Sequence, residues 1–113
     1  MNDCLFCKIV AGKIPSNKVY EDEKVIAFTD INPQAPVHIL IIPKKHIASV
    51  ADTSELDMDI YARIMSVGKR LAEEFGLKGG YRLVTNIGKD GGQAVDHLHF
   101  HLLGGRTMGW PPG

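Results

Sequence analysis

The segment HLHFHLLGG at residues 97–105 constrains the fold most, because polar and apolar side chains alternate along it. In a β-strand, successive side chains point to opposite faces, so residues at every second position share one face. A helix would spread the same residues around its circumference. The alternation therefore predicts a strand that two glycines end, with leucine and phenylalanine facing a core. The opposite face carries three imidazoles: His97, His99 and His101.

Three imidazoles on one face suggest a metal site, because histidine is the commonest metal ligand. Same-face neighbours on a strand are roughly 6.6 Å apart, so the outer two are about 13 Å apart. Zinc–nitrogen bonds are only about 2.0–2.1 Å long, so two adjacent histidines could share an ion and all three could not. At least one imidazole is then free for nucleophilic or acid–base chemistry. A half-buried strand with a polar face is the alternative.

The composition predicts one domain spanning residues 1–113, since a chain of this length suits a single core. The 13 basic and 13 acidic residues cancel, which argues against a nucleic-acid partner or a membrane surface. The longest apolar run, 39–42, is too short to span a bilayer. The N-terminus MNDCLFCKIV has an early acid and no long apolar segment, so we expect a cytoplasmic protein.

Cys4 and Cys7 form a Cys-x-x-Cys pair, CLFC, which has four possible interpretations. A structural disulfide is not expected in a reducing compartment. A redox pair usually lies within a βαβ pattern, which is absent here. The pair could be half of a zinc site whose other ligands come from elsewhere. It could also be two small buried hydrophobic residues on a short helix.

Two helices are predicted. Residues 54–75 carry apolar side chains at helical spacing, with Ser54 as N-cap and a glycine at the end. Residues 3–11 form a shorter helix with Asp3 as its cap. The stripe of the long helix comprises Leu56, Ile60, Ile64, Val67, Leu71 and Phe75.

Four further strands are expected, at 18–21, 24–28, 37–42 and 81–86. The segment VHILII at 37–42 is apolar on nearly both faces, although His38 interrupts it, so this strand should be central. Helices and strands do not alternate strictly. The predicted fold class is therefore α+β, an antiparallel sheet of about five strands with one long and one short helix.

The glycine-rich loop NIGKDGGQAVDH at 86–97 leads into the histidine segment. Glycines let backbone N–H groups approach an anion closely. The loop matches neither the Walker pattern nor the dinucleotide fingerprint. It could be an ordinary hairpin loop, but its position before the histidines favours a phosphate-binding role.

The segment HLHFHLL resembles the signature of the histidine triad (HIT) family. Three further segments strengthen the resemblance: DINPQAPVHILIIPKKHI, GYRLVTNIGKDGGQAVDHLHFHLLGGR and the terminal WPPG. They are similar to the Hint branch, the purine nucleoside phosphoramidases. The resemblance runs from about Cys4 to Gly113.

This resemblance implies a homodimer whose strands join into one ten-stranded sheet. It implies hydrolysis of the P–N bond in AMP or GMP linked to an amine, lysine or an aminoacyl group. His99 would be the nucleophile of a covalent nucleotidyl-histidine intermediate, and His101 would donate to a phosphate oxygen or to the departing amine. His97 and His38 complete the catalytic set. A dinucleotide hydrolase or nucleotidyl transferase of the same superfamily, or a non-catalytic nucleotide-binding protein, remains the alternative.

The resemblance also implies a nucleotide site. Apolar residues surround the base, Asp30 holds the ribose hydroxyls, and backbone N–H groups of 92–95 stabilise charge on the phosphate. Related animal proteins carry a serine where this chain has Ala94, so we expect an altered rate or leaving-group preference. Trp110 should reach the partner subunit's site. The expected nucleotide-binding residues are Phe6, Ile9, Phe28, Asp30, Ile31, Leu40, Asn86, Gly92, Gln93, Ala94, Val95 and Trp110.

Zinc is the cofactor that the resemblance implies, because some bacterial relatives bind it through Cys-x-x-Cys and two histidines. The expected ligands are Cys4, Cys7, His46 and His97, a closed Cys₂His₂ structural site. The chemistry itself would need no cofactor. The expected partners are a purine nucleotide and a second copy of the chain.

Overall fold

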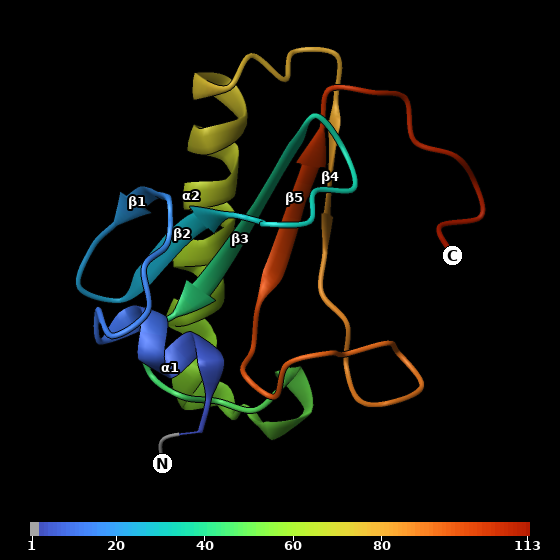
Figure 1. Cartoon of the computed structure of the whole chain (residues 1–113). Helices are drawn as coiled ribbons and strands as arrows, with labels where there is room; N and C mark the ends of the chain where they lie inside the picture. Colours follow the sequence, from blue (N-terminus) through green and yellow to red (C-terminus); the bar gives the residue numbers. More distant parts are fainter. Residues whose placement is uncertain (1–2) are drawn as a thin grey trace.

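The computed structural model describes residues 3–113 and has a five-stranded sheet with a helix on each face (Figure 1). Its elements are α1 (Leu5–Val10), β1 (Lys18–Glu21), β2 (Val25–Thr29), β3 (Val37–Pro43), α2 (Met58–Glu74), β4 (Tyr81–Val84) and β5 (Phe100–Gly104). Two short 3₁₀ turns, Val50–Asp52 and Glu55–Asp57, precede α2. The predicted α+β class is confirmed.

The strand order is β1-β2-β3-β5-β4, and every neighbouring pair is antiparallel. The prediction that the VHILII segment is the central strand is therefore confirmed. Its apolar residues serve two cores, because Ile39 and Ile41 face α2 whereas Leu40 and Ile42 face α1. A strand covered by a helix on both faces has no polar side, which explains the continuous apolar run.

The histidine segment differs from the prediction, since β5 begins only at Phe100 and leaves His97 and His99 outside it. Continuing the β3–β5 register from Ile41↔Phe100 would place Leu98 opposite Pro43, which has no N–H to donate. The Leu98 N–H donates instead to the Ile47 carbonyl at 2.7 Å. The predicted alternation of faces nevertheless holds along the segment. Its apolar members, Leu98, Phe100 and Leu102, belong to the core beneath α2.

The N-cap of α1 is Cys4 and not Asp3, so the predicted cap is wrong. The Cys4 side chain accepts the Cys7 backbone N–H, with sulfur and nitrogen 3.3 Å apart. The thiol thereby does what a serine hydroxyl does at a helix start.

The predicted stripe of α2 is right along its middle and wrong at both ends. Ser54 caps the 3₁₀ turn that leads into α2, with a capping box that includes Asp57, whereas the N-cap of α2 itself is Asp57. Leu56 lies in the 3₁₀ turn before α2, out of phase with the helix, and is 92% exposed. Phe75 follows the last helical residue and is exposed too. The remaining four stripe residues are buried: Ile60, Ile64, Val67 and Leu71.

Within residues 3–113, no helix combines the length and the apolar character that crossing a membrane requires.

The turn between β1 and β2 is organised by the carboxylate of Asp22. One oxygen accepts the backbone N–H groups of Lys24 and Val25, at 2.7 and 2.9 Å. The other accepts Tyr20 and Arg63, both at 2.8 Å. Burial acts to raise the pKa of this carboxyl, but the backbone and side-chain hydrogen bonds outweigh burial and lower the pKa to about 2.

We expect Asp22→Ala to lower the free energy of unfolding by about 2 kcal/mol at neutral pH, because two backbone donors lose their acceptor. Since the folded pKa lies below the usual 3.8, the contribution is present above about pH 4 and lost as the pH falls toward about 2. Urea unfolding at several pH values measures both effects. Asp90→Ala, at an exposed loop position, is the control, and equal stability of the two variants at neutral pH would contradict the prediction.

Candidate active site

The main chain fixes which nitrogen of His99 carries a proton. Its Nδ1 lies 2.7 Å from the carbonyl oxygen of His97, and a carbonyl can only accept. Nδ1 therefore donates, and Nε2 keeps a free lone pair. The backbone is held as well, because the Thr85 hydroxyl donates to the His99 carbonyl at 2.8 Å. The ring is buried edge to face against Phe6, with centroids 5.1 Å apart.

A second chain of hydrogen bonds fixes His101 in the complementary tautomer. The Gln34 backbone N–H donates to His38 Nδ1 at 3.0 Å, so the His38 proton is on Nε2. That Nε2 lies 2.9 Å from His101 Nδ1 and donates to it. The proton of His101 is therefore on its Nε2. Asp30 Oδ2 lies 3.5 Å from His38 Nε2 and faces the same junction.

The imidazole rings of His38 and His101 are both neutral near pH 7. Burial lowers the pKa of His38, and the charge of Asp30 only partly offsets that effect. Burial, assisted by repulsion from His99 and His38, lowers the pKa of His101 to about 4. His99 and His101 lie side by side, with ring centroids 5.1 Å apart. One ring presents a lone pair and its neighbour presents an N–H.

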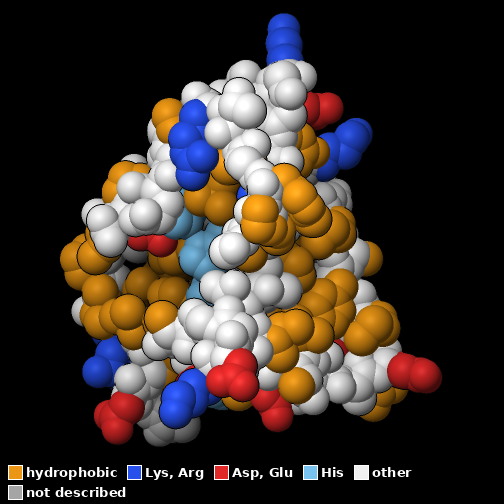
Figure 2. Space-filling view, turned by 90° about the vertical axis from the view of Figure 1, so that its right-hand side faces the viewer, with side chains coloured by type: hydrophobic (Ala, Val, Ile, Leu, Met, Phe, Trp, Pro, Cys, Tyr) orange, Lys and Arg blue, Asp and Glu red, His pale blue; other side chains and the backbone are white. Residues whose placement is uncertain are grey.

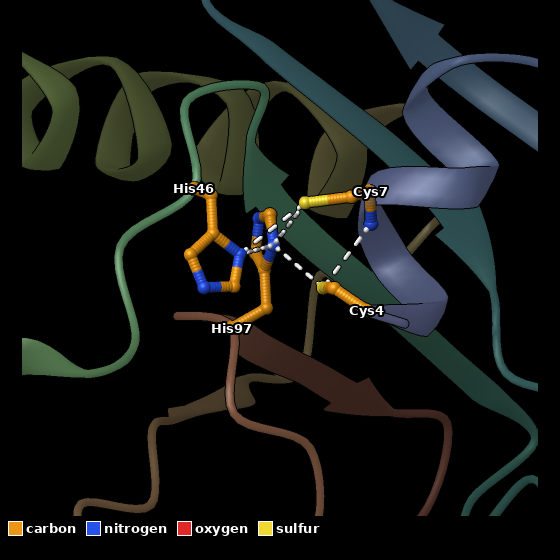
Figure 3. Close-up of side chains that lie close together, drawn as sticks. All are labelled: Cys4, Cys7, His46 and His97. Atoms are coloured by element: carbon orange, nitrogen blue, oxygen red, sulfur yellow. Dashed lines mark hydrogen bonds between the residues drawn. The ribbon is translucent and has the colours of Figure 1, made fainter. Parts of the chain in front are cut away.

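Four potential metal ligands converge from three segments, as Figure 3 shows. Cys4 and Cys7 come from the start of α1, His46 follows β3, and His97 precedes β5. Their ligand atoms all lie within 4.8 Å of one another. His97 Nδ1 is 3.3 Å from Cys4 Sγ, 3.6 Å from Cys7 Sγ and 3.2 Å from His46 Nδ1.

The spacing fits a tetrahedral ion. Zinc bonds of about 2.3 Å to sulfur and about 2.0–2.1 Å to nitrogen place neighbouring ligand atoms roughly 3.3–3.7 Å apart. His97 Nε2 lies 2.8 Å from the Pro43 carbonyl and therefore carries the proton, which leaves Nδ1 free to ligate. Both cysteines are free thiols. The donor set can thus hold zinc, and it includes His97 but neither His99 nor His101.

A pocket of about 320 Å³ adjoins the histidines. Phe6, which lines the pocket, also packs against the His99 ring. Asp30, which lines it too, faces His38 Nε2. In Figure 2, imidazoles lie at the bottom of a hollow that apolar side chains border. The structure brings together in this pocket seven of the residues expected to bind nucleotide: Phe6, Ile9, Phe28, Asp30, Ile31, Leu40 and Val95.

The other expected nucleotide residues do not line this pocket. The Gln93 side chain is engaged by the main chain, since its amide donates to the carbonyls of Ala48 and Val95 and accepts the Gly88 N–H. It therefore holds the glycine-rich loop in place. Trp110 is 83% exposed on the C-terminal tail. The remaining members are half-buried or exposed residues of the glycine-rich loop: Asn86, Gly92 and Ala94.

Some of the residues that organise the site were not identified from the sequence. Ser16, Asn17 and Thr29 line the pocket, and Thr85 and Gln34 hold the histidines. Gln34 acts through its main chain, which no side-chain pattern reveals. Thr85 could have been noticed as a hydroxyl at the end of a strand beside the histidines.

Known proteins share this fold and much of this sequence. The HIT domain family matches residues 11–108. The chain belongs to the HIT family. A 14 kDa zinc-binding protein from Zea mays is 53% identical to this HIT protein over 111 residues, covering 96% of this chain and 87% of the relative.

Solved HIT structures share the fold closely. A HIT family hydrolase from Legionella pneumophila Philadelphia 1 has a TM-score of 0.96 and 55% identity, covering 98% of this chain and 100% of that one. A histidine triad protein from Clostridium difficile has a TM-score of 0.93 and 50% identity, covering 96% of each chain. Cys4 and Cys7 precede the range matched by the HIT domain but lie within a chain that these relatives cover almost completely.

Proposed function

We propose that this HIT protein hydrolyses the P–N bond of purine nucleoside 5′-phosphoramidates. One observation carries the proposal: the lone pair of His99 Nε2 and the N–H of His101 Nε2 occur on adjacent rings beside a pocket of nucleoside size. A nucleophile and a hydrogen-bond donor side by side are what displacement at phosphorus needs. The hydrolase name of the L. pneumophila relative supports the reaction class.

In the proposed reaction, His99 Nε2 attacks the α-phosphorus and the P–N bond to the amine breaks. His101 donates its Nε2 proton to the bridging nitrogen, which departs as an amine, and His101 regains a proton from the water that enters in the second step. Water then attacks the phosphorus of the nucleotidyl-histidine and breaks the P–Nε2 bond. The water supplies the proton and hydroxyl that balance the products, an amine and a nucleoside 5′-monophosphate.

The pocket would hold the nucleoside during these steps. Its apolar wall, which includes Phe6 and Phe28, suits a purine base, and Asp30 suits the ribose hydroxyls. Of the backbone N–H groups of 92–95, those of Gly92 and Gln93 already donate to carbonyls of the same loop. Those of Ala94 and Val95 would stabilise the charge that develops on the phosphate. Ala94 offers no hydroxyl there, and one lost hydrogen bond is worth about 0.5–1.5 kcal/mol, enough to change a rate without abolishing it.

We also propose a homodimer in the cytoplasm. β4 is an edge strand of the five-stranded sheet, so its outer backbone groups can pair with a second copy. Two such sheets joined at one edge make ten strands. The C-terminal tail runs away from its own sheet and carries the exposed Trp110 (Figure 1). That arrangement supports the proposal that Trp110 reaches the partner's pocket.

We expect the native protein to release AMP from adenosine 5′-phosphoramidate and His99→Ala to lower the rate by at least about 1,000-fold, because the nucleophile is gone. Chromatography of AMP measures release, and calorimetric titration with AMP shows that the variant still binds nucleotide.

Release that survives in the variant would exclude His99 as the nucleophile. Native protein that binds AMP without turnover would favour a nucleotide-binding protein. Faster cleavage of a dinucleoside polyphosphate would favour the dinucleotide hydrolases.

We further propose that zinc occupies the cluster of Cys4, Cys7, His46 and His97. Zinc would tie α1 to the loop after β3 and to the segment before β5. The name of the Z. mays relative supports the metal. Both cysteines must be reduced to ligate, which agrees with the expected compartment.

Metal analysis of protein purified without chelators should find about one zinc per chain. The double variant Cys4→Ser/Cys7→Ser should lose it, whereas the hydroxyl introduced at position 4 would still cap α1, so the fold should persist. Circular dichroism checks the fold, and a chelator should lower the Tm of the native protein only. Native protein well below one zinc per chain, or a double variant with unchanged zinc, would contradict the assignment.

A further inference from the structure

The turn after β5 is hydrogen-bonded to, and packs closely against, the loop that carries Asp30 and Gln34. Arg106 donates from Nε and Nη2 to the Gln34 carbonyl oxygen, at 3.2 and 3.1 Å. Gly105 has a φ of +92°, and a Cβ built on it would lie 2.8 Å from Pro36 Cβ. A residue with a side chain would be strained by that backbone and would clash at that contact. Two adjacent residues after the histidine strand therefore hold the loop 30–36 closely.

Gln34 connects the Arg106 contact to the histidines. Its carbonyl accepts Arg106, and its own N–H donates to His38 Nδ1 at 3.0 Å. The carbonyl and the N–H lie in the two peptide planes that flank the Gln34 Cα, so holding the carbonyl restricts the backbone rotations that would turn the N–H away from the imidazole. If the N–H turned away, His38 Nδ1 would be free to carry the proton, and His38 Nε2 would accept from His101 instead of donating to it.

We propose that Arg106 is a positioning residue that keeps the His101 proton on Nε2, acting through Gln34 and His38. The chain of contacts is continuous: guanidinium to Gln34 carbonyl, Gln34 N–H to His38 Nδ1, and His38 Nε2 to His101 Nδ1 at 2.9 Å. Arg106 itself is exposed and donates to main-chain carbonyls, including that of Thr107. Its planar fork suits a shared acceptor better than a single ammonium does.

The effect on turnover rests on the proposed phosphoramidase function, whereas the effect on the His101 tautomer does not. A misplaced proton leaves His101 Nε2 unable to donate to the departing nitrogen. Cleavage should then slow where the leaving group needs that donor. A leaving group that departs as a stable anion should be nearly insensitive to the change.

The experiment compares Arg106→Met and Arg106→Lys with the native protein and with Arg70→Met. Arg70 is an exposed arginine on α2 that pairs with Glu74, so its loss is a matched control. ¹⁵N NMR of the imidazole nitrogens reads the tautomers of His38 and His101 directly. Kinetics use two substrates with the same nucleotide: AMP joined to an alkylamine, and the p-nitrophenyl ester of AMP.

In Arg106→Met we expect the His101 ring to lose its single Nε2–H tautomer and kcat for the amine substrate to fall about 10-fold, part of what a positioned donor supplies. KM for that substrate and kcat for the ester should stay close to the native values. Arg106→Lys should recover part of the loss, and Arg70→Met should behave as native in every measurement.

Native tautomers in Arg106→Met, or equal slowing on both substrates, would overturn the positioning role. A native protein that cleaves neither substrate would refute the proposed function alone, because the NMR result still decides whether Arg106 sets the tautomer.

Discussion

The site depends on main-chain groups that determine which ring nitrogen of each buried imidazole carries the proton. The Pro43 carbonyl accepts the Nε2–H of His97, and the His97 carbonyl accepts the Nδ1–H of His99. The Gln34 backbone N–H donates to Nδ1 of His38. Each contact leaves the other ring nitrogen with one defined role. Neutral imidazole has two tautomers of similar energy, so such contacts are what turn a group of histidines into a directed set.

His97 joins the metal cluster to the nucleophile. Its Nδ1 faces the two cysteines, and its carbonyl accepts a hydrogen bond from Nδ1–H of His99. α1 makes a second connection, because Cys7 contributes to the cluster while Phe6 packs on His99 and lines the pocket. An ion in the cluster would thus stabilise both the base pocket and the backbone that orients the nucleophile.

Periodicity predicted the central strand and the two faces of the histidine segment, because the spacing of apolar residues records which side of an element is buried. Ser54 was recognised by its residue type, although it caps the 3₁₀ turn before α2 and not α2 itself. The start of β5 could not be predicted, since it depends on a proline in the neighbouring strand. Leu56 was misplaced because a 3₁₀ turn changes the helical phase. Ligand convergence was expected from a family resemblance, whereas the roles of Gln34 and Arg106 depend on main-chain contacts between loops, which residue types do not encode.

The most direct test is mass spectrometry of the protein quenched in alkali during turnover of adenosine 5′-phosphoramidate. We expect an adenylyl group on the peptide that contains His99, attached to Nε2, since Nδ1 is held by the His97 carbonyl. An adduct on another residue, or AMP release with no adduct at any quench time, would contradict it.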